Sequence, residues 1–332
     1  MTTGPIRLPL LLLTGFLGSG KTTLLNRLLK HPVASATAVI INEFGEISID
    51  DALIERRDGN TMVLNSGCVC CSVRDSLAVT LDELFESRRA GTIPMFDRVV
   101  LETTGLADPG PILRLLATEP KVAGRYAICL VATTIDSVNA ATTLAAHPQA
   151  VRQVARADLL LLTKTDLADP QAVAALRGTL IRMNPLAQVA EARDDDTIEA
   201  LLSDRFQSTV GSGLMPPSLA PDAEQHDHAD HLHGIETFVY RHAEALPWTA
   251  FATLLSRLNL LASEDLLRVK GLVFVAGQPG PVVIHGVQQL IHAPTVLPAW
   301  PDAQTPPSTR IVCIARPAAI APLRQIFTEI FA

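Results

Sequence analysis

Aromatic and basic residues are scarce in this chain of 332 residues. Aromatic residues make up 4% of the chain, which is too few for a platform on which nucleobases stack. The 27 lysines and arginines are outnumbered by 34 aspartates and glutamates, so the net charge of −7 argues against a broad basic face for nucleic acid. Because 48% of the residues are hydrophobic, the chain can still bury a core and is not globally disordered.

No hydrophobic run is long enough to cross a bilayer. The most apolar stretch, residues 8–17, is far shorter than the roughly 20 residues that a spanning helix needs. It also lacks the basic start and the cleavage site of a secretory signal, since only Arg7 precedes it and Gly-Ser-Gly-Lys follows it. We therefore interpret this run as a buried strand and expect a cytoplasmic protein that does not contact membranes.

Cysteine is rare as well, and its five copies do not suit a disulfide framework. Cys68, Cys70 and Cys71 lie too close together to bridge one another readily, whereas Cys129 and Cys313 stand in strand-like runs and are expected in the core. The cluster favours a reducing compartment and a site for a soft or borderline metal such as Zn²⁺ or Cu⁺. Buried structural cysteines or a redox pair are the alternatives, although the C-x-x-C spacing of redox pairs is absent.

Apolar runs of strand length alternate with helix-like segments over residues 5–210. The runs are continuously apolar, which is typical of strands covered on both faces of a parallel sheet. The alternation predicts a doubly wound α/β domain with a mostly parallel sheet. The expected strands are 10–13, 38–41, 62–64, 98–101, 127–132 and 158–162, and the expected helices are 22–29, 76–89, 110–116, 147–155 and 172–183.

A change of composition separates a second, smaller domain. Residues 211–233 are rich in Gly, Pro, Ser, Asp and His and are interpreted as a linker. Its histidines, His226, His228, His231 and His233, either bind a metal ion or belong to a plain polar linker. Residues 234–332 predict an α+β domain with strands at 235–241, 269–276, 282–288 and 310–315 and helices at 247–261 and 318–331.

Residues 15–22 match the phosphate-loop pattern G-x-x-x-x-G-K-[ST] without a mismatch. A strand leads in and an apolar helix leads out, so the loop and the helix N-terminus present backbone N–H groups to phosphates. Lys21 is expected to reach the β- and γ-phosphates, and the Thr22 hydroxyl to ligate Mg²⁺. The predicted nucleotide-binding residues here are Gly15, Phe16, Leu17, Gly18, Ser19, Gly20, Lys21, Thr22 and Thr23.

Acidic residues at two further strand ends are candidate magnesium ligands. The strand at residues 99–101 ends in Glu102, which is expected to hold Mg²⁺ or its water, and Gly105 is expected to let the backbone approach the γ-phosphate. Lys21, Glu102 and Gly105 are therefore the predicted catalytic residues. The acidic segment 42–50 offers Glu43 to the thiol-bound metal and Asp50 to Mg²⁺, unless it is a solvated acidic turn.

Thr163, Lys164 and Asp166 follow another apolar strand in the pattern T-K-x-D. A carboxylate at this position can accept hydrogen bonds from N1–H and N2–H₂ of guanine, which adenine does not offer, so Asp166 favours GTP over ATP. The usual guanine motif is N-K-x-D, and its asparagine ties the loop to the phosphate loop. Thr163 therefore predicts a looser base site.

Four segments in one order, GFLGSGKTT, NEFGEISID, GCVCCS and LETTGLADP, resemble the CobW-like family of metal-associated P-loop GTPases. The resemblance extends over nearly the whole chain, including the C-terminal domain. It implies a P-loop NTPase fold and a GTP- and Mg²⁺-dependent metallochaperone that binds zinc or cobalt through Cys68, Cys70 and Cys71. It also implies a client protein that receives the metal, and a homodimer is an open alternative to a monomer.

The nucleotide is expected to control the metal. The γ-phosphate would set the geometry of residues 43–50 and 68–71, and slow hydrolysis would change the metal's coordination, since no glutamine or arginine finger is evident. Three other readings stand beside this one. They are a regulatory GTP-binding protein that delivers no metal, a cobalt-dedicated member of the family, and a small-molecule kinase with the same phosphate loop.

Overall fold

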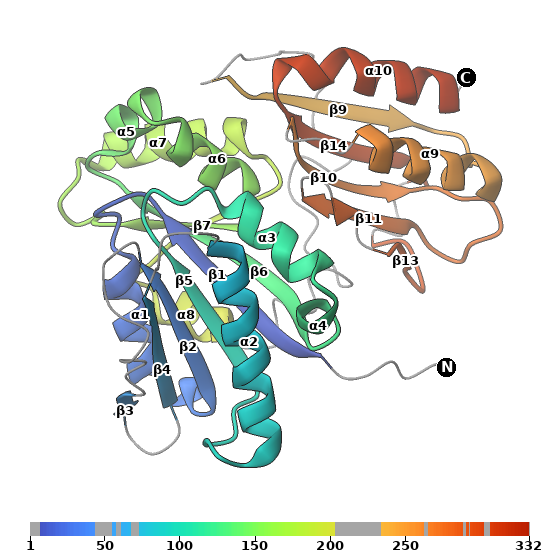
Figure 1. The fold of residues 1–332 in the computed structure, drawn as a ribbon. Coiled ribbons are helices and arrows are strands. Elements are labelled where there is room, and N and C mark those ends of the chain that lie inside the picture. Colours follow the sequence, from blue (N-terminus) through green and yellow to red (C-terminus); the bar gives the residue numbers. More distant parts are fainter. Residues whose placement is uncertain are drawn as a thin grey trace. The chain divides into compact units, whose positions relative to one another are not determined.

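The computed structural model describes residues 7–43, 55–57, 61–67, 73–202, 234–261, 265–287, 290–291, 293–301 and 306–331. Contacts divide the chain into two compact units, and each unit carries one sheet (Figure 1). The predicted linker with its four histidines lies outside the described residues. Among the described residues, we find no helix with the length and apolar character that crossing a membrane requires.

The first unit holds an eight-stranded sheet in the order β3-β4-β2-β5-β1-β6-β7-β8. Neighbouring strands from β4 to β7 in this order are parallel, whereas β3 is antiparallel to β4. The parallel P-loop NTPase sheet predicted from the continuous apolar runs is thus confirmed. The strands are β1 (Leu8–Gly15), β2 (Thr37–Glu43), β3 (Glu55–Arg57), β4 (Thr61–Gly67), β5 (Arg98–Thr103), β6 (Tyr126–Asp136), β7 (Leu159–Thr163) and β8 (Gln188–Glu191).

Helices cover this sheet because the strands are apolar on both faces. Leu11 and Leu13 of β1, for example, join a core with leucines of α1 and α8, and nearly every residue of β1 is buried. The helical elements are α1 (Lys21–Lys30), the 3₁₀ turn η1 (Pro32–Ala34), α2 (Val73–Ala90), α3 (Pro109–Thr118), α4 (Pro120–Ala123), α5 (Ala140–Ala146), α6 (Pro148–Arg156), α7 (Pro170–Met183) and α8 (Asp195–Leu202).

The second unit holds an antiparallel sheet in the order β12-β11-β10-β14-β9, and β13 pairs with β11. Its apolar core contains Phe251 and Leu254 of α9 and Leu323 and Phe327 of α10, and also Cys313, which is buried as predicted. The elements are β9 (Glu236–His242), α9 (Trp248–Leu261), β10 (Leu266–Val273), β11 (Val282–Val287), β12 (Leu290–Ile291), β13 (Thr295–Val296), β14 (Thr309–Ala315) and α10 (Pro317–Phe331).

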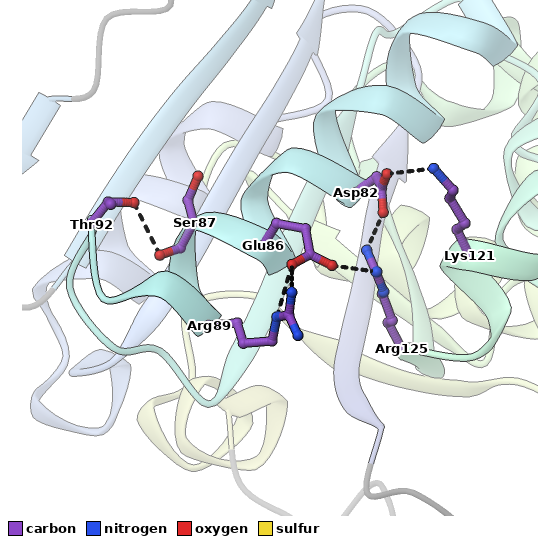
Figure 2. Close-up of polar contacts among 7 residues, drawn as sticks. All are labelled: Asp82, Glu86, Ser87, Arg89, Thr92, Lys121 and Arg125. Carbon is purple, nitrogen blue, oxygen red and sulfur yellow. Dashed lines mark hydrogen bonds and ion pairs between the residues drawn. The ribbon is translucent and has the colours of Figure 1, made fainter.

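A network of ion pairs fixes α2, the helix that follows the cysteine cluster in the chain (Figure 2). Asp82 accepts from Lys121 at 3.0 Å and from Arg125, and Arg125 also donates to Glu86 at 2.5 Å. The hydrogen bond from Lys121 and the charge of Arg125 hold the pKa of Asp82 below its usual 3.8. The network therefore ties the middle of α2 to the chain around α4 and the start of β6.

Candidate functional site

The phosphate loop connects β1 to α1 and depends on its glycines. Gly15, Gly18 and Gly20 have φ angles of +143°, +69° and +91°, which are strained for any residue with a side chain. A Cβ on Gly15 would also lie 2.2 Å from Thr134 Oγ1. The hydroxyls of Ser19 and Thr134 are 2.7 Å apart, so the loop is anchored to β6. The local fold is the phosphate-binding loop that the sequence predicted.

Lys21 lies over the loop to which it belongs. Its ammonium donates to the carbonyl oxygen of Gly15 at 2.9 Å and to that of Phe16 at 3.3 Å, and the residue is 8% exposed. The positive charge is therefore concentrated inside the loop, where phosphate oxygens bind in proteins of this fold.

The side chains of Thr22 in α1 and Glu102 in β5 form a hydrogen bond. Thr22 is the second residue of α1, Glu102 lies near the end of β5, and the Thr22 hydroxyl donates to Glu102 Oε1 at 3.2 Å. Glu102 is only 2% exposed, so its carboxylate is buried at the end of β5. A hydroxyl and a carboxylate that converge in this way are the hard oxygen ligands that Mg²⁺ prefers, and the pair fits that ion.

Gly105 packs directly against the phosphate loop. A Cβ at this position would lie 2.6 Å from the backbone nitrogen of Leu17 and 2.7 Å from its Cα. The segment that follows Glu102 therefore touches the backbone and the side chain of Leu17 in the phosphate loop. Its predicted approach to the γ-phosphate stays a prediction, but the contact with Leu17 is an additional reason for a glycine here.

The T-K-x-D loop is tied to the phosphate loop through Thr163. The Thr163 hydroxyl lies 2.8 Å from the carbonyl oxygen of Ser19 and 3.1 Å from that of Ile135. The shorter side chain of threonine thus makes a tie through its hydroxyl, and the looser base site stays a prediction. Asp166 is exposed at the carboxyl end of the sheet, where a base can reach it.

Lys164 pairs with Asp136 beside this loop. The two side chains meet at 2.7 Å, and Lys164 adopts a left-handed backbone conformation with φ +54°. Burial opposes ionisation of Asp136, but hydrogen bonds from Lys164, Asn139 and the Val138 N–H outweigh it and hold the pKa of Asp136 below 3.8. The Asp136 carboxylate is thus ionised at neutral pH.

Among the proposed ligands of the transition metal, only Glu43 lies in the part of the chain that the structure describes. Cys68, Cys70, Cys71 and Asp50 lie outside the described residues, but the strands that lead to them are described. Glu43, the last residue of β2, is the register partner of Gly67, the residue before Cys68. Because Ile41 of β2 also pairs with Glu102, the strand ending in Glu43 lies between the strand of the cysteine cluster and that of the magnesium candidate.

Comparison with known proteins decides the family. A model described as "CobW/HypB/UreG, nucleotide-binding domain" matches residues 9–191, more than half of the chain. The chain belongs to the CobW/HypB/UreG family. A second model, the "Cobalamin synthesis protein cobW C-terminal domain", matches residues 235–330. The resemblance seen in the four sequence segments is confirmed.

Several relatives of this CobW/HypB/UreG chain carry names. The zinc chaperone YjiA of Escherichia coli (strain K12) is 36% identical over 300 residues, which are 90% of this chain and 92% of YjiA. The zinc chaperone CobW of Pseudomonas aeruginosa is 32% identical over 315 residues, 85% of this chain and 80% of that protein. The crystal structure of Zn(II)-bound YjiA GTPase from E. coli matches 98% of this chain and 99% of its own with a TM-score of 0.76 and 29% identity.

A cavity of about 420 Å³ adjoins the phosphate loop of this family member, and its lining contains residues that the sequence reasoning missed. Asp136 could have been found, because it follows an apolar strand as Glu102 and Asp166 do. His147 and Gln153 carried no such signal. The polar and aromatic lining residues are Phe16, Ser19, Thr134, Asp136, Asn139, Thr142, Thr143, His147, Gln153 and Lys164.

Proposed function

We propose that this chain is a GTP-hydrolysing metallochaperone that binds a divalent transition metal, most favourably zinc, and delivers it to a client protein. The observation that carries this proposal is the pairing of an intact phosphate loop and its Thr22–Glu102 contact with full-length similarity to the Zn(II)-bound YjiA GTPase. The length of the similarity matters because it covers 98% of this chain and not the nucleotide domain alone.

The nucleotide site supports GTP as the substrate. Phosphates would lie along residues 15–23 with Lys21 at the β- and γ-phosphates, and guanine would lie at Thr163, Lys164 and Asp166. The bond between Thr163 and Ser19 holds these two parts in register, at an oxygen–oxygen distance of 2.8 Å. This contact between the two loops thus favours one continuous site for the phosphates and the guanine base of GTP.

Thr22 and Glu102 are the residues that would hold Mg²⁺, and Asp50 is a further candidate. When bound, Mg²⁺ would supply positive charge that neutralises the phosphates. The chain itself contributes two effects to hydrolysis. Lys21 places a positive charge at the phosphates, and the segment after Glu102 brings the backbone of Gly105 to the same loop.

Zinc is the cargo in this proposal, held by Cys68, Cys70 and Cys71 with Glu43 as a candidate fourth ligand. Three thiolates favour zinc among the borderline ions, and tetrahedral zinc accepts a carboxylate as the fourth ligand. Pairing of Glu43 with Gly67 supports this set, because it brings the carboxylate-bearing residue opposite the start of the cysteine cluster. Cobalt is the alternative cargo. Free thiols in such a cluster need a reducing compartment, which supports a cytoplasmic location.

One observation favours a second function, in which zinc regulates the GTPase and is not delivered. The "Zinc-regulated GTPase metalloprotein activator 1" of Schizosaccharomyces pombe is 33% identical over 216 residues, which are 62% of this chain and 51% of that protein. Under this alternative, zinc bound at the cysteines would change GTP turnover while staying in place.

Zinc release during turnover tests the proposal and separates it from the alternative. The zinc-loaded chain is mixed with a chromogenic zinc chelator in Mg²⁺ buffer containing GTP, GDP or a non-hydrolysable GTP analogue. We expect the fastest transfer to the chelator with GTP, and loss of that advantage in Glu102→Gln. Equal transfer rates in all three nucleotides, together with zinc-dependent GTP hydrolysis, would establish the regulatory alternative. Sedimentation in the same nucleotides tests whether a homodimer forms.

A further inference from the structure

Gln153 of α6 holds the segment that follows Glu102. Its amide nitrogen lies 3.2 Å from the carbonyl oxygen of Gly105 and 3.0 Å from that of Ala107, and the residue is 1% exposed. Both partners are carbonyl oxygens, which only accept hydrogen bonds, so the nitrogen end of the amide must face the segment. One side chain thus fixes two peptide units that lie more than 40 residues earlier in the chain.

The other end of the same amide has no comparable support. Among the residues that the structure describes, no donor lies within hydrogen-bond distance of Gln153 Oε1, and the side chain lines the cavity beside the phosphate loop. A buried acceptor without a donor is unfavourable for folding. An apolar side chain such as leucine would occupy this position without that penalty, so the favourable contribution of Gln153 is its hold on the two carbonyl groups.

The segment that Gln153 holds, around Gly105 and Ala107, also contacts the phosphate loop. Gly105 approaches Leu17 so closely that a Cβ would lie 2.6 Å from the Leu17 nitrogen. Gly105 therefore contacts Gln153 through its carbonyl oxygen and the phosphate loop through its Cα. Rotation of this peptide would require loss of the Gln153 hydrogen bond.

We propose that Gln153 is a positioning residue for GTP hydrolysis, which fixes the peptides of Gly105 and Ala107 so that the backbone after Glu102 faces the γ-phosphate. The inference rests on the proposed GTPase function. It predicts that Gln153 affects the chemical step more than nucleotide binding, because the side chain donates its hydrogen bonds to the segment after Glu102.

Gln153→Leu tests the proposal, because leucine fills a similar volume and donates no hydrogen bond. We expect kcat for GTP hydrolysis to fall about tenfold or more, since both positioning hydrogen bonds are lost, with KM for GTP and affinity for GDP changed less than about twofold. The matched control is Tyr126→Phe, which removes another buried side-chain bond to a carbonyl oxygen, from Tyr126 to Leu81 at 2.8 Å, without touching the segment. This control should keep its kcat.

Gln153→Glu gives a second readout that a purely structural role would not change. Burial and the two facing carbonyl groups raise the pKa of a carboxyl group placed here, and only its protonated form can donate. The ratio of the variant's kcat to that of the wild type should therefore rise as the pH falls from about 8 to about 5.5. It should stay flat if the residue only fills space.

The outcomes separate this inference from the function on which it rests. A wild-type chain that does not hydrolyse GTP contradicts the proposed function. A wild-type chain that hydrolyses GTP while both folded Gln153 variants keep kcat within twofold, with a flat pH ratio, overturns the role of Gln153 alone. Circular dichroism shows that the variants are folded, and if Gln153→Leu is not, the pH ratio of Gln153→Glu decides.

Discussion

The Thr163 hydroxyl lies 2.8 Å from the carbonyl oxygen of Ser19 and so joins two loops that are 144 residues apart in the chain. Glycine favours this approach, because a Cβ on Gly20 would make a tight contact of 3.3 Å with Thr163 Cγ2. The contact joins the T-K-x-D loop, which is proposed to bind guanine, to the phosphate loop. A threonine thus performs the tie that asparagine makes in the usual N-K-x-D motif.

Thr163→Val should weaken nucleotide binding. Valine keeps the shape of threonine but loses the hydroxyl, and a buried carbonyl left without its donor costs about 1–3 kcal/mol. We expect the affinities for GTP and GDP to fall together, by about fivefold or more. Isothermal titration calorimetry measures both affinities.

Thr163→Ser keeps the hydroxyl and should restore the affinity. Thr165→Val is the matched control, since Thr165 lies in the same loop but donates to Glu191 Oε2 at 2.8 Å and not to the phosphate loop. Equal losses in Thr163→Val and Thr165→Val would show that any change in this loop weakens binding, and the specific tie would then have no role.

Gly105→Ala should impair GTP hydrolysis. The new Cβ would meet the backbone of Leu17 at 2.6 Å, and backbone atoms cannot move aside as a flexible side chain can. We expect kcat for GTP to fall at least about tenfold, because the phosphate loop or the segment after Glu102 must shift. Single-turnover hydrolysis of bound GTP measures this step.

Gly178→Ala is the control for that substitution. Gly178 lies inside α7, and the nearest atom to its Cβ would be Arg182 Nη1 at 3.6 Å, an ordinary contact. Alanine should raise the free energy of unfolding by about 0.5–1 kcal/mol and leave kcat unchanged, since alanine favours the helix. An unimpaired Gly105→Ala variant would show that the contact with Leu17 is not needed for hydrolysis.

The parallel strands could be predicted because each is a continuous apolar run, and the phosphate loop because its spacing is a local pattern. β3 and β8 were missed, since they are short and lack such a run. The role of Gln153 could not be predicted either, because its partners are two backbone carbonyls in a distant segment. The tie made by Thr163 depends on the room beside Gly20, which appears only in three dimensions.

Asp136→Asn should lose stability in a pH-dependent way. The folded-state pKa of Asp136 lies below its usual 3.8, so its bonds to Lys164 and Asn139 stabilise the fold above about pH 4, and this contribution is lost as the pH falls through the folded-state value. At neutral pH the variant should lose about 1–2 kcal/mol, as expected for a hydrogen bond to a charged group.

Urea unfolding of the two proteins at several pH values measures this difference. The gap between them should shrink below about pH 4. Asp97→Asn is the control, because the Asp97 side chain is 61% exposed and its ion pair with Arg98 should contribute little at any pH. A gap of constant size down to pH 3 would mean that the charge of Asp136 does not contribute.

Arg125→Met should lower the thermal stability of the first unit. Methionine can still pack on Phe85, over whose ring the guanidinium lies at 4.6 Å, but it leaves Asp82 and Glu86 as a like-charged pair one helical turn apart (Figure 2). The loss should be smaller in 1 M salt, where the repulsion is screened. Arg89→Met, which removes a mostly exposed partner of Glu86, should have little effect in a thermal scan.

Replacing the clustered thiols should remove the transition metal without removing the nucleotide. Cys68, Cys70 and Cys71 are the only cysteines of the five that lie together, and their segment begins where β4 ends opposite Glu43. The triple change to serine should lower zinc affinity by at least about 100-fold, since serine hydroxyls are poor ligands for this ion. Cys129→Ser is the control, because the Cys129 thiol donates to the Leu10 carbonyl inside the sheet at 3.2 Å. Competition with a zinc chelator measures the affinities, and GDP binding should be the same in all three proteins. Unchanged zinc affinity in the triple variant would place the metal elsewhere and contradict the cargo site.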